Sequence, residues 1–159
     1  MRRHPALREF SDDHHRGLVH ALRLRRAASG EGGDLVEVAG AFLRFFREET
    51  EAHFEKEERV LLPVAEEAGV SMGEPGIRRM LAEHAALREV VRRIEAGISG
   101  GALRRETVGE AGDLLEGHIR LEEREVFPML ERLLPEAALA ELERRVAAFG
   151  RGQGGGSNP

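Results

Sequence analysis

Hydrophobic residues recur every three or four positions along most of this chain, which is the spacing of one face of an α-helix. The pattern predicts four long helices over about residues 6–28, 34–69, 77–96 and 103–134, and a shorter fifth helix over 136–149. Glycine-rich turns follow the first and third helices, and Asp34 is a suitable N-cap for the second. Pro135 favours the start of the fifth helix.

Four long helices joined by short turns predict an all-α, up-down-up-down four-helix bundle with a short C-terminal fifth helix. A chain of 159 residues fits one domain, and we expect the bundle to occupy residues 1–149. Residues 150–159 are glycine-rich and carry no apolar side chain, so we expect them to be disordered.

Ionisable residues interrupt two of the apolar stripes, in a phrase that occurs twice. Both copies have the form H-x-x-x-E-E-R, one beginning at His53 and the other at His118. Residues four apart share a helix face, so His53 pairs with Glu57 and His118 pairs with Glu122. Lys and Arg are missing from these stripes near the two glutamates, and a buried carboxylate without a compensating charge is costly. We therefore predict a metal cation between the two pairs.

Histidines on the first and third helices complete the candidate set of ligands. His84 begins an apolar row on the third helix and so belongs to its buried face. On the first helix His15 precedes Leu18 and Leu22 with a similar spacing, whereas His14 aligns with a glycine and an alanine. Helix phase therefore favours His15 as the ligand, and His14 remains a supporting or alternative ligand.

Composition narrows the chemistry further. The chain contains no Cys, which excludes disulfides, thiolate zinc sites and cysteine-held iron–sulfur clusters, so nitrogen and oxygen atoms must be the ligands. A net charge of −5 argues against binding to nucleic acid. The sequence has no apolar stretch long enough for a signal peptide or a membrane span, and we expect a cytoplasmic protein without a membrane partner.

The assembled residues resemble the hemerythrin-like, or HHE cation-binding, family over about residues 10–133. The matching positions are His15, His53, Glu57, His84, His118 and Glu122. The resemblance implies two iron ions with an oxo, hydroxo or water bridge, the four histidines as terminal ligands and the two glutamates as bridges. Manganese and zinc also accept nitrogen and oxygen ligands.

One departure from the family bears on the activity. Oxygen-carrying hemerythrins have an H-x-x-x-H pair on the third helix, whereas Met80 and Arg88 stand four residues to either side of His84. The four-histidine, two-glutamate set looks more like bacterial HHE proteins linked to iron, oxygen, nitric oxide or peroxide response. The resemblance therefore implies a protein that binds dioxygen or a related small ligand, for sensing of oxygen, nitric oxide, redox state or iron, or for iron storage.

The alternative is a di-iron enzyme that handles peroxide or nitric oxide, or one that repairs iron–sulfur clusters. The chain has no Tyr or Trp to serve as a radical relay, which weakens the case for a self-contained oxidase. It also lacks the Cys-containing N-terminal domain of the repair proteins that it resembles. In either case the expected partner is a small diatomic ligand or peroxide.

Overall fold

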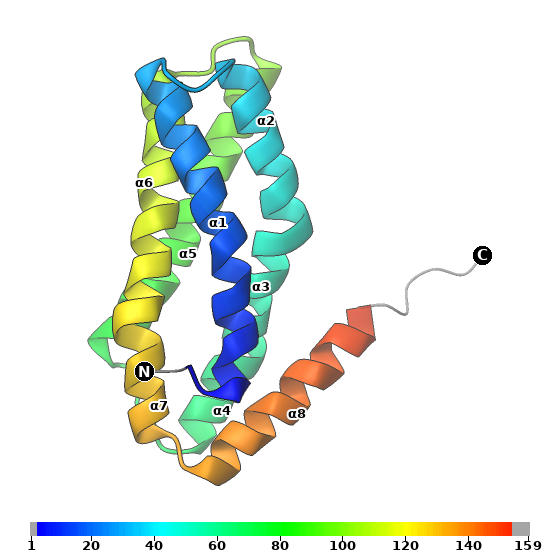
Figure 1. The fold of residues 1–159 in the computed structure, drawn as a ribbon, viewed down its shortest axis with the longest axis vertical. Coiled ribbons are helices and arrows are strands. Elements are labelled where there is room, and N and C mark those ends of the chain that lie inside the picture. The colour runs from blue at the N-terminus through cyan, green and yellow to red at the C-terminus, as the bar shows by residue number, and fades with distance from the viewer. Residues whose placement is uncertain (1–2, 154–159) are drawn as a thin grey trace, which may run out of the picture.

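A computed structural model describes residues 3–153, which form an all-α bundle with a fifth helix across one end (Figure 1). The first and third long helices are α1 (Pro5–Ser29) and α5 (Pro75–Ser99). The second is a continuous rod of five segments: α2 (Leu35–Phe45), η1 (Phe46–Thr50), α3 (Glu51–Lys56), η2 (Glu57–Leu61) and α4 (Leu62–Glu67). The fourth rod has three segments: α6 (Arg105–Leu121), η3 (Glu122–Val126) and α7 (Phe127–Leu133). The predicted fold class is confirmed.

The helix ends lie within a few residues of their predicted positions. Gly30 ends α1 with a φ of 86°, a left-handed conformation that glycine adopts without strain. The Asp34 side chain accepts a hydrogen bond from the amide of Glu37 at 2.9 Å, which confirms Asp34 as the N-cap of α2. Across residues 3–153, no helix is both long enough and apolar enough to cross a membrane.

The fifth helix is longer than expected. It is α8 (Glu136–Gln153), so residues 150–153, predicted to be disordered, continue it. The rest of the predicted disordered tail, residues 154–159, lies outside the described residues. Leu139, Leu142 and Val146 of α8 are buried, and Figure 1 shows α8 starting at the end of the bundle beside α4 and then slanting away from it.

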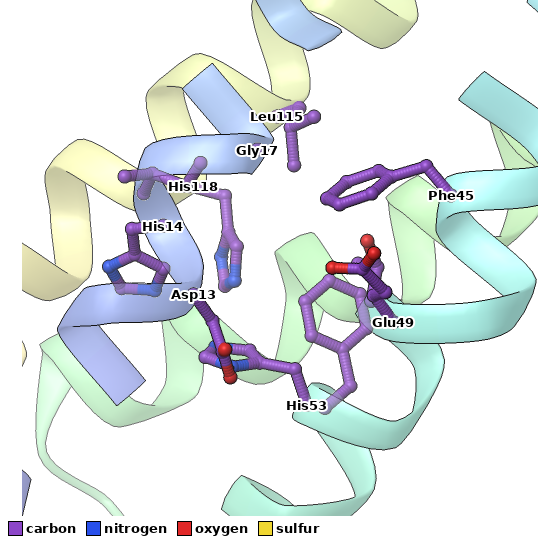
Figure 2. A pocket seen from close by; sticks show the side chains of 11 residues that line it. Asp13, His14, Gly17, Phe45, Glu49, His53, Leu115 and His118 are labelled. Carbon is purple, nitrogen blue, oxygen red and sulfur yellow. The ribbon is translucent and has the colours of Figure 1, made fainter. Parts of the chain in front are cut away.

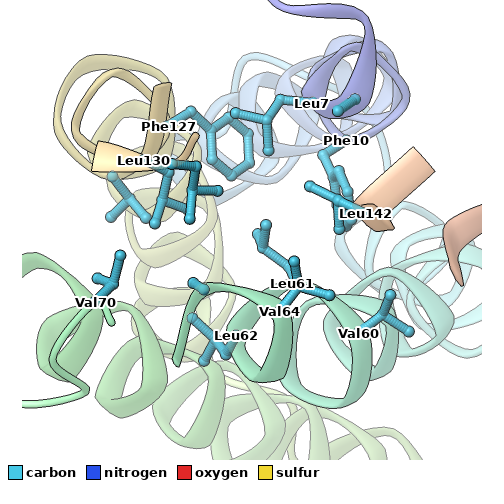
Figure 3. Close-up of a cluster of buried hydrophobic side chains, with 14 of the residues drawn as sticks. Leu7, Phe10, Val60, Leu61, Leu62, Val64, Val70, Phe127, Leu130 and Leu142 are labelled. Atoms are coloured by element: carbon cyan, nitrogen blue, oxygen red, sulfur yellow. The ribbon is translucent and has the colours of Figure 1, made fainter. Parts of the chain in front are cut away.

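Two apolar clusters fill the bundle, one towards each end. The first lies at the end covered by α8, where side chains from α1, η2, α4, η3 and α7 meet those of the fifth helix (Figure 3). The second lies towards the turns that follow α1 and α5, and Phe42 and Ile94 are among its fully buried members. The gap between the two clusters is where the ionisable side chains gather.

Glycine allows α1 and α6 to approach each other closely. A β-carbon added to Gly112 would lie 2.9 Å from the carbonyl oxygen of Ala21, and one added to Gly17 would lie 2.8 Å from Ile119 Cδ1. A side chain at either position would push the helices apart or displace a neighbour. This close approach brings the first helix against one of the two H-x-x-x-E-E-R copies.

Candidate metal centre

Six ionisable side chains from the four long helices meet between the two apolar clusters, and all six are buried. They are His14 of α1, His53 of α3, Glu57 of η2, His84 of α5, His118 of α6 and Glu122 of η3. Five of them were predicted from the sequence, and the structure brings those five together.

The six residues form two overlapping groups of four, each compact enough to hold a cation. One group is His14, His53, Glu57 and Glu122, and the other is Glu57, His84, His118 and Glu122. In each group the possible ligand atoms all lie within 4.8 Å of one another. Both glutamates belong to both groups, so each carboxylate has a position between two possible cations.

The two oxygens of each carboxylate face different groups. Glu57 Oε1 lies 3.2 Å from His53 Nε2, while its Oε2 lies 3.2 Å from His84 Nε2. Glu122 does the same, with Oε2 at 2.9 Å from His14 Nε2 and Oε1 at 3.1 Å from His118 Nε2. Donors about 2.1 Å from one ion and at right angles to each other lie about 3 Å apart, so these spacings suit shared coordination.

The buried atoms at the centre of the cluster lack the hydrogen bonds that such atoms normally make. The four histidine Nε2 atoms and the four carboxylate oxygens of Glu57 and Glu122 have no hydrogen-bond partner within residues 3–153. The histidine nitrogens lie close to the carboxylate oxygens, but the angles between them do not suit hydrogen bonds. Buried polar groups are nearly always satisfied, so this donor set fits a bound cation.

A second layer of carboxylates holds the outward nitrogen of every histidine. The Nδ1 atoms of the four rings donate to four carboxylates: His14 to Glu123 at 2.7 Å, His53 to Asp13 at 3.1 Å, His84 to Glu58 at 2.7 Å and His118 to Glu83 at 3.3 Å. In a neutral imidazole this arrangement keeps the ring proton on Nδ1, so the Nε2 lone pair would be available to a metal.

Arginines hold three of these outer carboxylates in turn. Arg3 contacts Glu123 at 2.6 Å, Arg88 contacts Glu58 at 2.8 Å, and Arg79 contacts Glu83 at 2.8 Å. Glu58, Glu83 and Glu123 therefore each contact an arginine as well as a histidine. Their bonds to histidine are an additional feature that the sequence analysis missed.

Electrostatics in the metal-free protein favours protonated imidazoles. Burial lowers the pKa of His53, but the charge of Glu57 and the hydrogen bond to Asp13 outweigh it and raise that pKa to about 10. The pKa of His118 also reaches about 10, because the charge of Glu122 overcomes the effect of burial. Burial acts to raise the pKa of Glu122, yet the positive charge of His118 and the other imidazoles close to the carboxylate hold it well below its ordinary value. A bound cation would therefore replace protons as the balancing charge.

The π-helical segments η2 and η3 begin at the glutamates of the two H-x-x-x-E-E-R copies. Glu57 contacts Nε2 of His84 while its neighbour Glu58 contacts Nδ1 of the same ring. Glu122 and Glu123 contact the two nitrogens of His14 in the same way. Each consecutive glutamate pair thus holds both nitrogens of one imidazole, in the kind of local π-helix that is frequent at functional sites.

The prediction that His15 faces the other ligands is wrong. His15 is exposed, and His14, the alternative residue, lies in the cluster. The buried face of α1 continues from His14 through Gly17 and Ala21, because only small residues fit where α1 approaches α6. Leu18 and Leu22, whose apolar character suggested the other phase, are 40% and 54% exposed.

The sequence does contain a signal for His14, Asp13 and Glu83 that the helix-phase argument overlooked. An acidic residue directly precedes the buried histidine on both the first and the third long helix, as Asp13-His14 and Glu83-His84. In each half of the chain that acidic residue bonds Nδ1 of the histidine in the repeated phrase. Matching these two dipeptides selects His14 over His15.

A small cavity borders the cluster between α1, the η1 region and α6 (Figure 2). Its volume is about 30 Å³, and one water molecule needs roughly 10–15 Å³. His14, His53 and His118 line it, and Figure 2 shows Phe45 and Leu115 on the side away from Asp13. The cavity therefore offers room for a ligand of very few atoms beside the histidines.

Comparison with known proteins agrees with this geometry. Searches of curated proteins and of solved structures found no match to the chain. Among protein families, the hemerythrin HHE cation binding domain matches residues 7–130, which include all six clustered residues and most of each of the four long helices. Domains of this type bind metal ions, and the buried histidines and glutamates could hold one. The chain therefore belongs to the hemerythrin HHE cation-binding domain family.

Proposed function

We propose that the centre holds two iron ions and that the protein uses them to bind dioxygen or a related small ligand, as a sensor or store of redox-active species. The observation that carries this proposal is the set of eight buried nitrogen and oxygen atoms without hydrogen-bond partners within residues 3–153. They divide into two groups that share both carboxylates, which suits two cations better than one.

The proposed ligands are His14 and His53 for one ion and His84 and His118 for the other, with Glu57 and Glu122 shared. When bound, iron supplies a redox-active Lewis acid. Each group provides two imidazoles and two carboxylate oxygens, which leaves coordination positions for an external ligand on an ion that accepts up to six donors.

The residues of the chain do three further things at the proposed centre. The outer carboxylates of Asp13, Glu58, Glu83 and Glu123 keep the ring protons on Nδ1. The two central carboxylates balance the positive charge of the ions. The apolar clusters on either side exclude bulk water, so a ligand reaches the centre through the small cavity.

The proposal is tested by loading the purified protein with ferrous iron under anaerobic conditions and measuring iron per chain. We expect two irons, followed by a change in the visible spectrum on exposure to oxygen that reverses when oxygen is removed. Peroxide is added to a separate sample.

Three outcomes would contradict the proposal in different ways. Binding of one iron would overturn the paired centre. Turnover of peroxide without a reversible oxygen spectrum would favour an enzyme. An unchanged melting temperature on adding iron, cobalt or zinc would exclude a metal centre, because a cation that binds only the folded state must stabilise it.

A further inference from the structure

Thr50 carries a buried hydroxyl beside the candidate metal centre, and that hydroxyl has no assigned role. The residue ends η1, lines the same cavity as His14, His53 and His118, and is 6% exposed. Its Oγ1 is inaccessible to solvent and has no hydrogen-bond partner in the described part of the chain. Within residues 3–153, nine buried side-chain nitrogen and oxygen atoms lack a hydrogen-bond partner. Eight belong to the candidate metal centre, and the ninth is Thr50 Oγ1.

Such a hydroxyl is unusual because threonine in a helix has a local way to satisfy it. In an ordinary α-helix the side chain can bond the carbonyl four residues earlier. Here that carbonyl belongs to Phe46 and accepts the amide of Glu51 in the π-helical geometry of η1, and Thr50 Oγ1 makes no hydrogen bond to it. A buried hydroxyl left without a partner destabilises the protein by its lost hydration. The local structure therefore maintains a free polar group at the cavity wall.

The residues that line the cavity determine what a ligand beside Thr50 would contact. Besides the histidines, the wall includes the acidic residues Asp13 and Glu49 and the apolar residues Phe45, Phe54, Leu115 and Ile119. The ring of His84 does not line the cavity, because it is fully buried and stacks on Phe54 with centroids 3.8 Å apart. A ligand in the cavity would therefore lie beside His14, His53 and His118, and Thr50 is the one residue of the lining that carries a hydroxyl.

We propose that Thr50 determines ligand specificity by hydrogen-bonding the small ligand of the centre in this cavity. The inference rests on the proposed function and refines it. The ligand class is a compact molecule or anion of two or three non-hydrogen atoms that can accept a hydrogen bond, which includes dioxygen, peroxide, nitric oxide and azide. The roughly 30 Å³ of the cavity matches a ligand of this size.

Azide is the probe, and its dissociation constant is measured spectroscopically with the iron-loaded protein. Thr50→Val keeps the shape of the side chain and removes the hydroxyl, so we expect azide to bind about five- to tenfold more weakly. Thr50→Ser keeps the hydroxyl, and we expect it to stay within about twofold of the wild type. Thr107→Val is the matched control, because Thr107 is also buried in a helix but does not line the cavity.

A second measurement separates ligand binding from a structural role. The metal-free Thr50→Val protein should melt no lower than the wild type, because the substitution removes an unsatisfied hydroxyl. A melting temperature several degrees lower would overturn the proposal by indicating a structural partner for Thr50. Equal azide affinity in the wild type and Thr50→Val would also overturn it. A wild-type protein that holds no iron would instead contradict the proposed function on which the inference depends.

Discussion

The buried histidines are fixed from both sides, which makes single residues decisive at this centre. Each ring has one nitrogen directed at the shared carboxylates and the other bonded to an outer carboxylate. A change of one position along a helix turns a side chain by about 100° and removes it from this arrangement. His14 and His15 are adjacent residues that provide a direct comparison.

We expect His14→Ala to lose iron and His15→Ala to retain it. His14 lies 2.9 Å from Glu122 in the buried cluster, whereas His15 is exposed. The measurement is iron per chain after anaerobic loading, with circular dichroism to confirm that both variants are folded. Iron loss from His15→Ala, or full occupancy in His14→Ala, would contradict the assignment of the ligand to His14.

The release of protons from the buried histidines on metal binding leads to a second prediction. The pKa values of His53 and His118 are raised to about 10 in the folded, metal-free protein, from about 6.5 for a free side chain. Their contribution to stability is therefore complete below about pH 6.5 and is lost as pH rises towards 10. Cation binding needs the deprotonated rings, so apparent affinity should rise by up to about tenfold per pH unit for each proton released.

The measurement is the melting temperature with and without cobalt, a probe that resists oxidation, between pH 6 and pH 8.5. As the pH rises over this range, we expect the melting temperature of the metal-free protein to fall. We expect the increase in melting temperature on adding cobalt to become larger. A cobalt effect that stays constant across this pH range would contradict proton displacement.

At the residue scale, helix phase from the sequence was sufficient for five of the six clustered residues. His53, Glu57, His84, His118 and Glu122 stand within strong apolar rows or in the repeated phrase, so their orientation was predictable. The first helix was different because its buried stripe contains small residues where it meets α6. Apolar size is a poor guide to burial where helices approach too closely for large side chains.

At the scale of elements, the π-helical segments explain why the two rods could not be fully predicted as regular helices. The second rod contains two such segments, η1 (Phe46–Thr50) and η2 (Glu57–Leu61), and the fourth contains η3 (Glu122–Val126). A π turn adds one residue and shifts the helical phase of the residues after it. The sequence predicts where the rods begin and end, but such a local insertion depends on contacts with neighbouring helices.

The close approach of α1 and α6 leads to opposite expectations for two glycines of the same helix. Gly112→Ala should lower the free energy of unfolding by about 1 kcal/mol or more, because the new β-carbon meets backbone 2.9 Å away. Gly117→Ala meets nothing within 4 Å and should raise it by about 0.5–1 kcal/mol through helix propensity. Urea denaturation of both variants checks this, and equal effects would contradict the packing argument.

At the scale of the whole molecule, the fifth helix closes one end of the bundle. Leu142→Ala should lower the free energy of unfolding by about 2–5 kcal/mol, because Leu142 is fully buried against the first apolar cluster. Leu133→Ala at the same end should change it by no more than about 0.5 kcal/mol, since that side chain is 51% exposed. Thermal unfolding measures both, and similar losses would contradict the role of α8 as a cover.

The bundle architecture was predictable because it depends on hydrophobic periodicity that is sustained along whole helices. The end of α8 was less predictable, because its last residues, 150–153, include Gly150 and Gly152 and have weak helix propensity. Composition indicated disorder there, and continuation of a packed helix outweighed it. Each residue added to an existing helix gains a hydrogen bond, so a helix anchored by Leu142 and Val146 can extend beyond its buried part.

The sharing of residues between the two cation groups has a consequence for the integrity of the chain. The turn at residues 68–74 separates two helical hairpins, and each group of four takes three residues from one hairpin and its fourth from the other. A cut in that turn would leave two fragments, each with an incomplete set of donors. Bound cations would then join the fragments as a reversible cross-link. In other proteins disulfides hold separate segments together, but this chain has no cysteine with which to form one.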